Sequence, residues 1–413
     1  MLTFRLVRSV VVVASTVAFL LPLAAASAGV AAIKPTNTIK AGNGPEAIAV
    51  DTQNATAWIA DNAGDSVTEI AHDKVRATIP LGAVSPIDIA VDSRTGTVWV
   101  ADGSSGSVTE ISAKTGHVVR TVTLSQTDAV ANAIAVDPVH GEVFVTEINL
   151  GDLVEFRESD PSAQHVANGG NTPLAVAADS SARTAWVTDE VGTVTEISYR
   201  RAHPTVLHTL HISGGTGAIA ADATAGLIFV AEYTGNAVAI ISAASRKVRT
   251  VKVGHSPGSL AVDPLHGDVW VANDGSSSIS QIRESTRKVL ATYPLGFSPS
   301  RVALQPAAGV YAVDFTANAV RFLAARLRLS APRSATFRTG RHGSLLITAA
   351  GFPAASVSLS GKLPAGLHWS ASGAGGRVAG TPKRGTDGTY HVTLRASTTW
   401  GQRASRSLTI RVR

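Results

Sequence analysis

The chain has 413 residues, of which 45% are hydrophobic, and a formal net charge of +6 at neutral pH. This length allows two or three domains, and the apolar content excludes a disordered chain. The absence of cysteine excludes a disulfide scaffold, a thiolate nucleophile and any zinc or iron–sulfur site with cysteine ligands.

Residues 1–28 have the pattern of a signal peptide, with two arginines, an apolar run over residues 10–25 and the small residues 26–28. The alternative is an uncleaved anchor, because the run approaches the roughly 20 residues that span a bilayer. Pro22 and the small-residue site favour cleavage. No later run is as long and apolar, so we expect a mature chain without a transmembrane helix that is secreted or associated with the cell envelope.

The charge is divided unevenly along the chain. Residues 29–325 hold 20 Lys and Arg against 29 Asp and Glu, whereas residues 326–413 hold 14 against 1. Such an asymmetry between two parts of a chain indicates separate domains. We therefore expect an acidic domain over 29–325 and a basic domain over 326–413.

A repeat of 41 to 45 residues fills the acidic part. Its first strand ends, in turn, at Asp51, Asp92, Asp137, Asp179, Asp222, Asp263 and Gln305. A second strand then carries one aromatic residue per repeat, namely Trp58, Trp99, Phe144, Trp186, Phe229, Trp270 and Tyr311. Third and fourth short strands follow between Gly-, Ser- and Asn-rich turns. Four short strands per repeat predict the blades of a β-propeller, with the aromatic residues in the core between blades.

Seven repeats predict seven blades in an all-β fold. The seventh repeat lacks its outermost strand, and residues 36–42 look like such a strand, so we expect the N-terminal segment to complete the last blade. That arrangement removes an open sheet edge. Through VWVAD at 98–102 and VWVAN at 269–273, residues 36–323 resemble the YVTN and NHL propeller families. The resemblance is specific for the fold and weak for the activity.

The basic part carries LPAGL at 363–367, GTP at 380–382 and GTYHVTLRA at 388–396. These segments resemble the Ig-like, cadherin-like modules of bacterial surface proteins, which implies a small β-sandwich. Alternating strands between Gly and Pro turns favour the same fold. Asp387 is the only acid there, whereas calcium needs six to eight oxygen ligands. Calcium binding is therefore not expected.

Acidic or amide residues that end the second strand of each repeat form the candidate binding site. They are Asp61, Asp102, Glu147, Asp189, Glu232, Asn273 and Asp314. Adjacent members are expected on the order of 10 Å apart around the ring, too far to share one cation but close enough to create a negative field. The alternative is that each side chain accepts hydrogen bonds within its own turn. We predict no metal site and no cofactor.

Three other motifs fit structural roles. GHSPG at 254–258 matches the G-x-S-x-G pattern, but it joins two strands and lacks the strand-to-helix turn of a nucleophile elbow. His140 and His266 lie in turns of different repeats and are interpreted as exposed turn residues.

The second strands also resemble those of streptogramin lyases, which carry a catalytic His just after the proline that enters the first strand. The equivalent positions here are Glu46, Ile87, Asn132, Leu174, Gly217, Gly258 and Ser300, none of which is an imidazole. We therefore expect an exported, non-catalytic binding or scaffold protein, with a secreted lyase or lactonase as the alternative.

The expected partners differ between the two domains. The propeller would bind a protein, glycan or cationic ligand, and the basic domain an anionic envelope polymer. Specific nucleic-acid binding is not expected. A second possibility for the opposite charges is that the basic domain docks electrostatically on the acidic one.

Overall fold

The computed structural model describes residues 34–125, 128–200 and 203–413. The predicted signal peptide at 1–28 lies outside these residues. The described chain is built of β-strands with three single-turn 3-10 helices: η1 (Asn62–Gly64), η2 (Asp274–Ser276) and η3 (Phe315–Ala317). Within the described residues, none of the helices has the length and apolar character of a membrane span.

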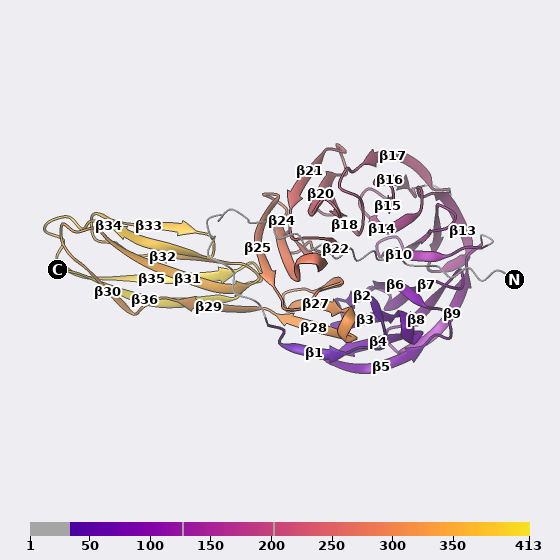
Figure 1. Ribbon diagram of the computed structural model, residues 1–413, viewed down its shortest axis with the longest axis horizontal. Helices are drawn as coiled ribbons and strands as arrows, with labels where there is room; N and C mark the ends of the chain where they lie inside the picture. The colour runs from indigo at the N-terminus through magenta and orange to yellow at the C-terminus, as the bar shows by residue number, and fades with distance from the viewer. Residues whose placement is uncertain (1–33, 126–127, 201–202) are drawn as a thin grey trace, which may run out of the picture.

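Seven four-stranded antiparallel sheets form the blades of the propeller (Figure 1). Blade 1 contains β2 (Pro45–Asp51), β3 (Thr56–Asp61), β4 (Ser66–Ala71) and β5 (Lys74–Pro80). Blade 2 contains β6 (Pro86–Asp92), β7 (Thr97–Asp102), β8 (Ser107–Ser112) and β9 (His117–Thr123). Blade 3 contains β10 (Ala131–Asp137), β11 (Glu142–Glu147), β12 (Asp152–Arg157) and β13 (Asp160–Asn168). Blade 4 contains β14 (Pro173–Asp179), β15 (Thr184–Asp189), β16 (Thr193–Ser198) and β17 (Thr205–His211).

Blade 5 contains β18 (Ile219–Asp222), β19 (Leu227–Glu232), β20 (Ala237–Ser242) and β21 (Val248–Lys252). Blade 6 contains β22 (Pro257–Asp263), β23 (Asp268–Asn273), β24 (Ser278–Arg283) and β25 (Lys288–Pro294). Blade 7 contains β26 (Arg301–Gln305), β27 (Gly309–Asp314), β28 (Ala319–Ala324) and the N-terminal strand β1 (Asn37–Lys40). The predicted all-β propeller is confirmed.

The blades pack against one another through their middle strands. Every residue of β3, for example, is buried, whereas β5 at the rim is mostly exposed. The aromatic residue of the second strand lies in this interface: Trp58 of blade 1 is fully buried and clusters with Ile89 and Val100 of blade 2. All seven of these aromatic residues are between 0% and 3% exposed, which confirms their predicted place in the core.

Blade 7 closes the ring with a strand from each end of the propeller. β1 pairs antiparallel with β28, Ile39 opposite Val320. The Gly44 N–H donates to Asn318 Oδ1 at 2.9 Å, which links blade 7 to blade 1. The predicted completion of the last blade by the N-terminal strand is confirmed.

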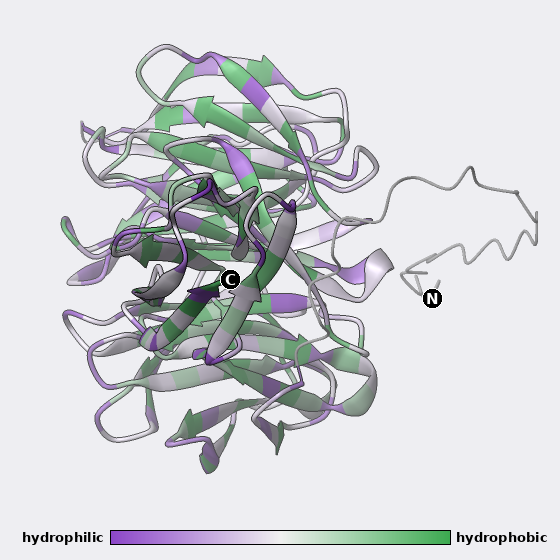
Figure 2. Ribbon diagram, turned by 90° about the vertical axis from the view of Figure 1, so that its left-hand side faces the viewer, coloured by the Kyte–Doolittle hydropathy of each residue, from purple (hydrophilic) through white to green (hydrophobic). Residues whose placement is uncertain are grey.

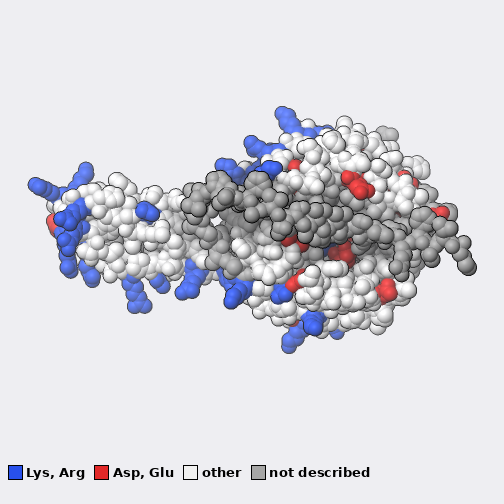
Figure 3. Space-filling view, viewed as in Figure 1, with Lys and Arg blue, Asp and Glu red and all other residues white. Residues whose placement is uncertain are grey.

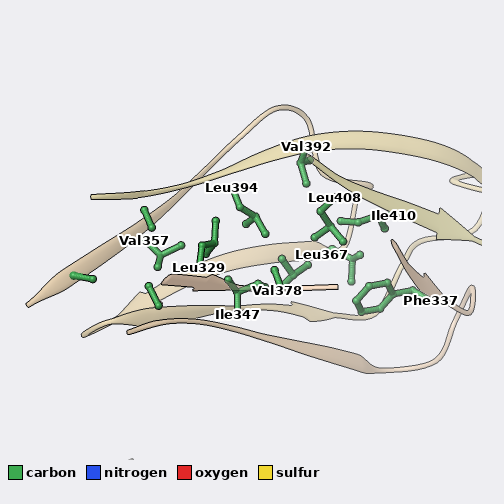
Figure 4. Packing of buried hydrophobic residues seen from close by; sticks show 14 of the residues in the cluster. Leu329, Phe337, Ile347, Val357, Leu367, Val378, Val392, Leu394, Leu408 and Ile410 are labelled. Atoms are coloured by element: carbon green, nitrogen blue, oxygen red, sulfur yellow. The ribbon is translucent and has the colours of Figure 1, made fainter. Parts of the chain in front are cut away.

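The C-terminal domain is a sandwich of two four-stranded sheets. One sheet contains β29 (Arg326–Ser330), β31 (Gly343–Phe352), β34 (Gly375–Gly380) and β33 (Leu367–Ser372). The other contains β30 (Ser334–Phe337), β36 (Arg403–Val412), β35 (Gly388–Thr398) and β32 (Ala355–Ser360). Their inner faces enclose an apolar core that includes Ile347, Val378, Leu394 and Leu408, all fully buried (Figure 4). Hydrophobic strands alternate with hydrophilic turns throughout the molecule (Figure 2).

An aromatic joint fixes the sandwich to blade 6. Phe352 and Trp400 of the sandwich pack on Trp270 and Tyr293, with ring centroids 5.0 Å apart for Trp270 and Phe352 and 5.5 Å apart for Trp270 and Trp400. Phe352 is fully buried and Trp400 is 6% exposed. Buried aromatic pairs of this kind stabilise a contact by about 0.5–1.5 kcal/mol beyond the area they bury.

Two hydrogen bonds complete the joint. Trp400 Nε1 donates to Asp263 Oδ2 at 2.7 Å, and the Ala354 N–H donates to Gln281 Oε1 at 2.9 Å. No Lys or Arg of the sandwich pairs with a propeller carboxylate within the described residues. Apolar burial and hydrogen bonds to neutral donors therefore hold the two domains together, and the electrostatic docking considered from the sequence is not what joins them.

We expect Ile39→Asp to lower the melting temperature strongly, because it places a carboxylate in the core that seals blade 7 against blade 1. An unpaired buried charge costs several kcal/mol. The matched control is Thr38→Asp, one residue earlier on the same strand and exposed. Thermal unfolding followed by circular dichroism makes the comparison, and equal melting temperatures would contradict the sealing role of β1.

Trp400→Ala should release the sandwich from blade 6, since truncating a buried Trp costs about 3–5 kcal/mol and leaves Asp263 without its indole donor. Small-angle X-ray scattering would record a larger maximum dimension. The control is Trp369→Ala, at the sandwich's other tryptophan, which packs on the sandwich core alone. An unchanged scattering profile for Trp400→Ala would mean that other contacts hold the joint.

Candidate functional site

The seven predicted site residues, which we call the acid ring, end the second strand of each blade. Asp61, Asp102, Glu147, Asp189, Glu232, Asn273 and Asp314 are the last residues of β3, β7, β11, β15, β19, β23 and β27. They therefore lie at one end of the propeller, here called the top face, where the turns between second and third strands meet. All seven are buried, with exposed fractions between 0% and 5%.

In three blades the acid-ring residue bonds to hydroxyls of the third strand. Asp102 Oδ2 accepts from Ser107 Oγ at 2.9 Å and from Thr109 Oγ1 at 2.8 Å. Asp61 accepts from Thr68 Oγ1 at 2.5 Å. In blade 6, Asn273 Nδ2 reverses the direction and donates to Ser278 Oγ at 3.2 Å and Ser280 Oγ at 2.9 Å. The position thus accepts an acid or an amide with the same partners.

In blades 4, 5 and 7 the partners include the backbone and the outer strands. Asp189 Oδ1 accepts from the Thr193 N–H at 2.7 Å, a bond within its own turn. Asp314 accepts from the Ala317 N–H at 3.2 Å and pairs with Arg321 at 2.5 Å. Glu232 accepts from Thr250 Oγ1 at 3.2 Å.

Burial changes the protonation of three acid-ring residues. Desolvation raises the pKa of Asp61 and of Asp102 to about 6, although their hydroxyl hydrogen bonds oppose the shift. Among the described residues, neither carboxylate oxygen of Glu147 has a hydrogen-bond partner, and burial together with the nearby Asp152 raises its pKa to about 7. Asp61 and Asp102 therefore become charged only as the pH passes about 6, and Glu147 only near neutral pH.

The geometry limits what the acid ring can do. Its side chains are too well covered to touch a ligand directly in this conformation, so they would act on one only through their field. The bonds of Asp189 and Asp314 match the alternative, in which each acid caps its own turn. In the part of the chain that the structure describes, no group of three or more His, Asp or Glu side chains could hold a metal ion.

A second polar group, which the sequence reasoning did not single out, lies at the start of the inner strands. Arg301 of blade 7 approaches Glu46 of blade 1, Nη2 to Oε1, at 3.6 Å. Asp88 of blade 2 accepts from the Ile89 and Ile134 N–H groups, both at 2.9 Å, and burial raises its pKa to about 6. The sequence could have indicated this group, because Asp88 and Arg301 occupy a position of the repeat that is filled by Ala or Ser in most other repeats.

The position compared with the lyase histidine is a β-bulge in five blades. The ladder skips one residue after Pro45, Pro86, Ala131, Pro173 and Pro257. The skipped residue in blade 1 is Glu46, whose carboxylate faces the Arg301 guanidinium. A bulge re-aims a side chain, and in blade 1 it directs a carboxylate toward an arginine. Nothing in this group supplies the neutral imidazole of the lyase.

The two turn histidines differ from the expectation of exposed side chains. His140 and His266 are 19% and 18% exposed, and Nδ1 of each bonds to the aspartate three residues earlier, at 2.6 and 2.8 Å. Asp137 and Asp263 already accept backbone N–H groups of these turns, and each imidazole adds a further contact to the same carboxylate. Ser256 of the G-x-S-x-G segment lies in a turn with φ 50°, directly before β22.

The basic surface of the sandwich is fully formed. All 14 of its Lys and Arg residues are exposed, and within the described residues none forms an ion pair. Figure 3 shows them spread over the sandwich as far as its end remote from the propeller. Several gather at that end, which we call the distal tip: residues 338–342, residues 382–387 and Arg413.

Backbone hydrogen bonds tie the three segments of the distal tip together. The Thr339 N–H donates to the Arg413 carbonyl at 2.8 Å, and the Gly340 N–H donates to the Pro382 carbonyl at 3.0 Å. Asp387 accepts from Thr339 Oγ1 at 3.0 Å, so the one acid of the domain serves the turn. The tip therefore holds its basic side chains on a fixed backbone with little opposing charge.

Comparisons with known proteins agree with this architecture. Residues 326–413 match the family described as Putative Ig domain (He_PIG). The structure is similar to Kuenenia stuttgartiensis hydrazine synthase, with a TM-score of 0.58 and 17% identity, over 68% of this chain and 95% of that one. At that identity the likeness concerns the fold alone. No curated protein has a sequence that matches this chain.

Asp102→Asn should stabilise the protein more at pH 8 than at pH 5, because the amide carries no charge and Asn273 already makes the same hydroxyl bonds in blade 6. Burial raises the pKa of Asp102 in the folded state to about 6, from its ordinary value of 3.8. The native state therefore binds the proton more tightly, and stability is lost as the pH rises from 4 through 6.

Melting temperatures at the two pH values test this, with a gain at pH 8 of roughly 2–4 °C for each kcal/mol recovered. Asp102→Ala is the control, since it removes the hydroxyl contacts and should lower the melting temperature at both values. A lower melting temperature for Asp102→Asn at pH 8 would mean that the charge itself stabilises the blade.

Proposed function

We propose that this chain is an exported, non-catalytic binding or scaffold protein whose basic sandwich contacts an anionic polymer of the cell envelope. The observation that carries the proposal is the set of 14 exposed Lys and Arg side chains that make no ion pair within the described residues. Charges that are not used inside the molecule remain available to a partner, and they attract polyanions over about a Debye length.

The joint supports the same proposal. Since Trp400 and Phe352 hold the sandwich by apolar contact, docking leaves the basic surface free. The sandwich then stands out from one side of the propeller, with the distal tip at its far end (Figure 1). Such an arm would attach the protein to a polymer while the propeller remains accessible as the platform for a protein, glycan or cationic ligand.

Export and propeller type are further parts of the proposal. The signal-peptide pattern of residues 1–28 supports a location outside the cytoplasm. VWVAD and VWVAN, which support kinship with YVTN or NHL propellers, coincide with the buried second strands β7 and β23. We do not propose the lyase or lactonase alternative, because the acid ring is buried and the Glu46 carboxylate faces the Arg301 guanidinium.

The test uses the whole mature chain and polyglycerol phosphate, a polymer with regularly spaced charges. We expect binding at low salt that is lost at high salt, and a roughly tenfold weaker affinity for the triple variant Arg341→Gln, Lys383→Gln and Arg384→Gln, as expected for a few exposed pairs. The matched control removes three exposed propeller lysines, Lys40→Gln, Lys74→Gln and Lys114→Gln.

The control should bind as the unmodified chain does. Absence of binding at low salt, or an equal loss in the tip and control variants, would overturn the proposal. In the first case the sandwich has no affinity for such polymers, and in the second the net charge alone accounts for binding.

A further inference from the structure

A pocket opens between blades 5 and 6 on the bottom face, the end of the propeller opposite the acid ring. It has a volume of about 470 Å³ and is lined by Leu227, Arg249, His266, Arg283, Glu284 and Arg287, among others. This volume lies within the range of about 300–1,000 Å³ that is typical of small-molecule sites.

The pocket is rich in positive charge that the fold does not use. Arg283 is held by Asp268, Nε to Oδ1, at 3.1 Å. The side chains of Arg249 and Arg287 form no ion pair or hydrogen bond within the described residues. Two guanidinium groups therefore stand free at the pocket.

A departure from the repeat explains why Arg249 is free. Its counterpart in blade 2 is Arg120, which pairs across the strands with Glu110 at 2.5 Å. In blade 5 the residue opposite Arg249 is Ile240, a buried apolar side chain. The internal partner has thus been replaced while the arginine has been retained.

A second departure leaves a carboxyl oxygen without a partner. Glu158, which follows β12 of blade 3, accepts from Trp99 Nε1 of blade 2 at 2.9 Å. Glu284 follows β24 of blade 6 in the same way, but the aromatic residue of blade 5 is Phe229, which has no donor. Glu284 is 6% exposed and its Oε1 has no hydrogen-bond partner.

The charge state of Glu284 suits an anionic ligand. Burial, and then the charge of Asp222 and a hydrogen bond shared with it, raise the pKa of Glu284 to about 8. At neutral pH the group is mostly protonated, so it adds little negative charge to the pocket. The proton shared with Asp222 leaves Oε1 as an acceptor.

We propose that this pocket binds an acidic saccharide, with the sugar carboxylate between Arg249 and Arg287 and a sugar hydroxyl donating to Glu284 Oε1. Guanidinium groups bind carboxylates through paired, charge-assisted hydrogen bonds. A hydroxyl satisfies a buried acceptor that otherwise costs about 1–3 kcal/mol. Inorganic phosphate dianion would match the arginines but brings no comparable set of hydroxyl donors. The pocket shares no residue with the distal tip, where the polymer is proposed to bind.

Isothermal titration of the whole mature chain with D-galacturonate tests the proposal, with D-galactose and inorganic phosphate as comparisons. We expect saturable binding of galacturonate, at least tenfold weaker binding of galactose and phosphate, and a loss of at least tenfold for Arg249→Gln combined with Arg287→Gln. Within the described residues these two side chains make no hydrogen bond or ion pair, so the double variant should remain folded. The control is Arg120→Gln, at the equivalent position of blade 2, which should bind normally.

Phe229→Trp gives a second readout, because four of the other blades already carry Trp at this position. An indole there should occupy Glu284 Oε1, as Trp99 occupies Glu158, and weaken galacturonate binding while the melting temperature is retained. Galacturonate oligomers are tested in the same way. If they bind more tightly than the monomer, the site is for a polymer; if they bind equally, it is for a free sugar acid or a chain end. Both results support an acidic-saccharide site.

Three results would overturn the proposal. They are no galacturonate binding by the unmodified chain, equal affinity for galactose or phosphate, and undiminished binding by the folded Arg249 and Arg287 double variant. Because the sandwich variants leave this pocket intact, failure here is distinguishable from failure of polymer binding at the distal tip.

Discussion

A blade of this propeller cannot bury its own core. Its two middle strands are covered on both faces, and the cover on each face comes from the neighbouring blade, as Trp58 illustrates by packing on blade 2. Every blade therefore needs two neighbours, which is possible only in a closed ring. The pairing of β1 with β28 and the bond from Gly44 to Asn318 meet that requirement. The flat faces on which the acid ring and the bottom pocket lie depend on the same closure.

Positions that depart from the repeat locate the parts with particular roles. Four blades carry a glutamate at one position of the third strand, and in three of them, at Glu69, Glu110 and Glu196, it pairs with an arginine. Blade 6 has Gln281 there, and its neutral amide bonds both to Asp268 and to the sandwich backbone at Ala354. Blade 5 has Ile240 there, which leaves Arg249 free. One substitution forms the domain joint, and the other contributes to a pocket.

The fold could be predicted largely from the sequence because period and pattern repeat seven times, so single errors average out. The uneven division of charge and the LPAGL and GTP turns predicted the position of the sandwich. The site was harder to predict. The sequence places the acid ring at the strand ends but does not reveal that the side chains are fully covered, since burial depends on neighbouring blades. The joint was missed because Phe352 and Trp400 belong to a domain whose docking face leaves no periodic signal.

The ring closure also determines the order in which the chain can fold. Thr36 and Phe322 are hydrogen-bonded although 286 positions separate them. A polypeptide that emerges from its N-terminus therefore completes blades 1–6 before the strand partner of β1 exists. Long-range pairing of this kind is slow, and unpaired strand edges remain open to other chains in the meantime. The sandwich is built from the contiguous residues 326–413 and follows directly after β28. It therefore emerges after the strand that permits closure. Premature termination anywhere before Ala324 would leave an open, association-prone array of blades.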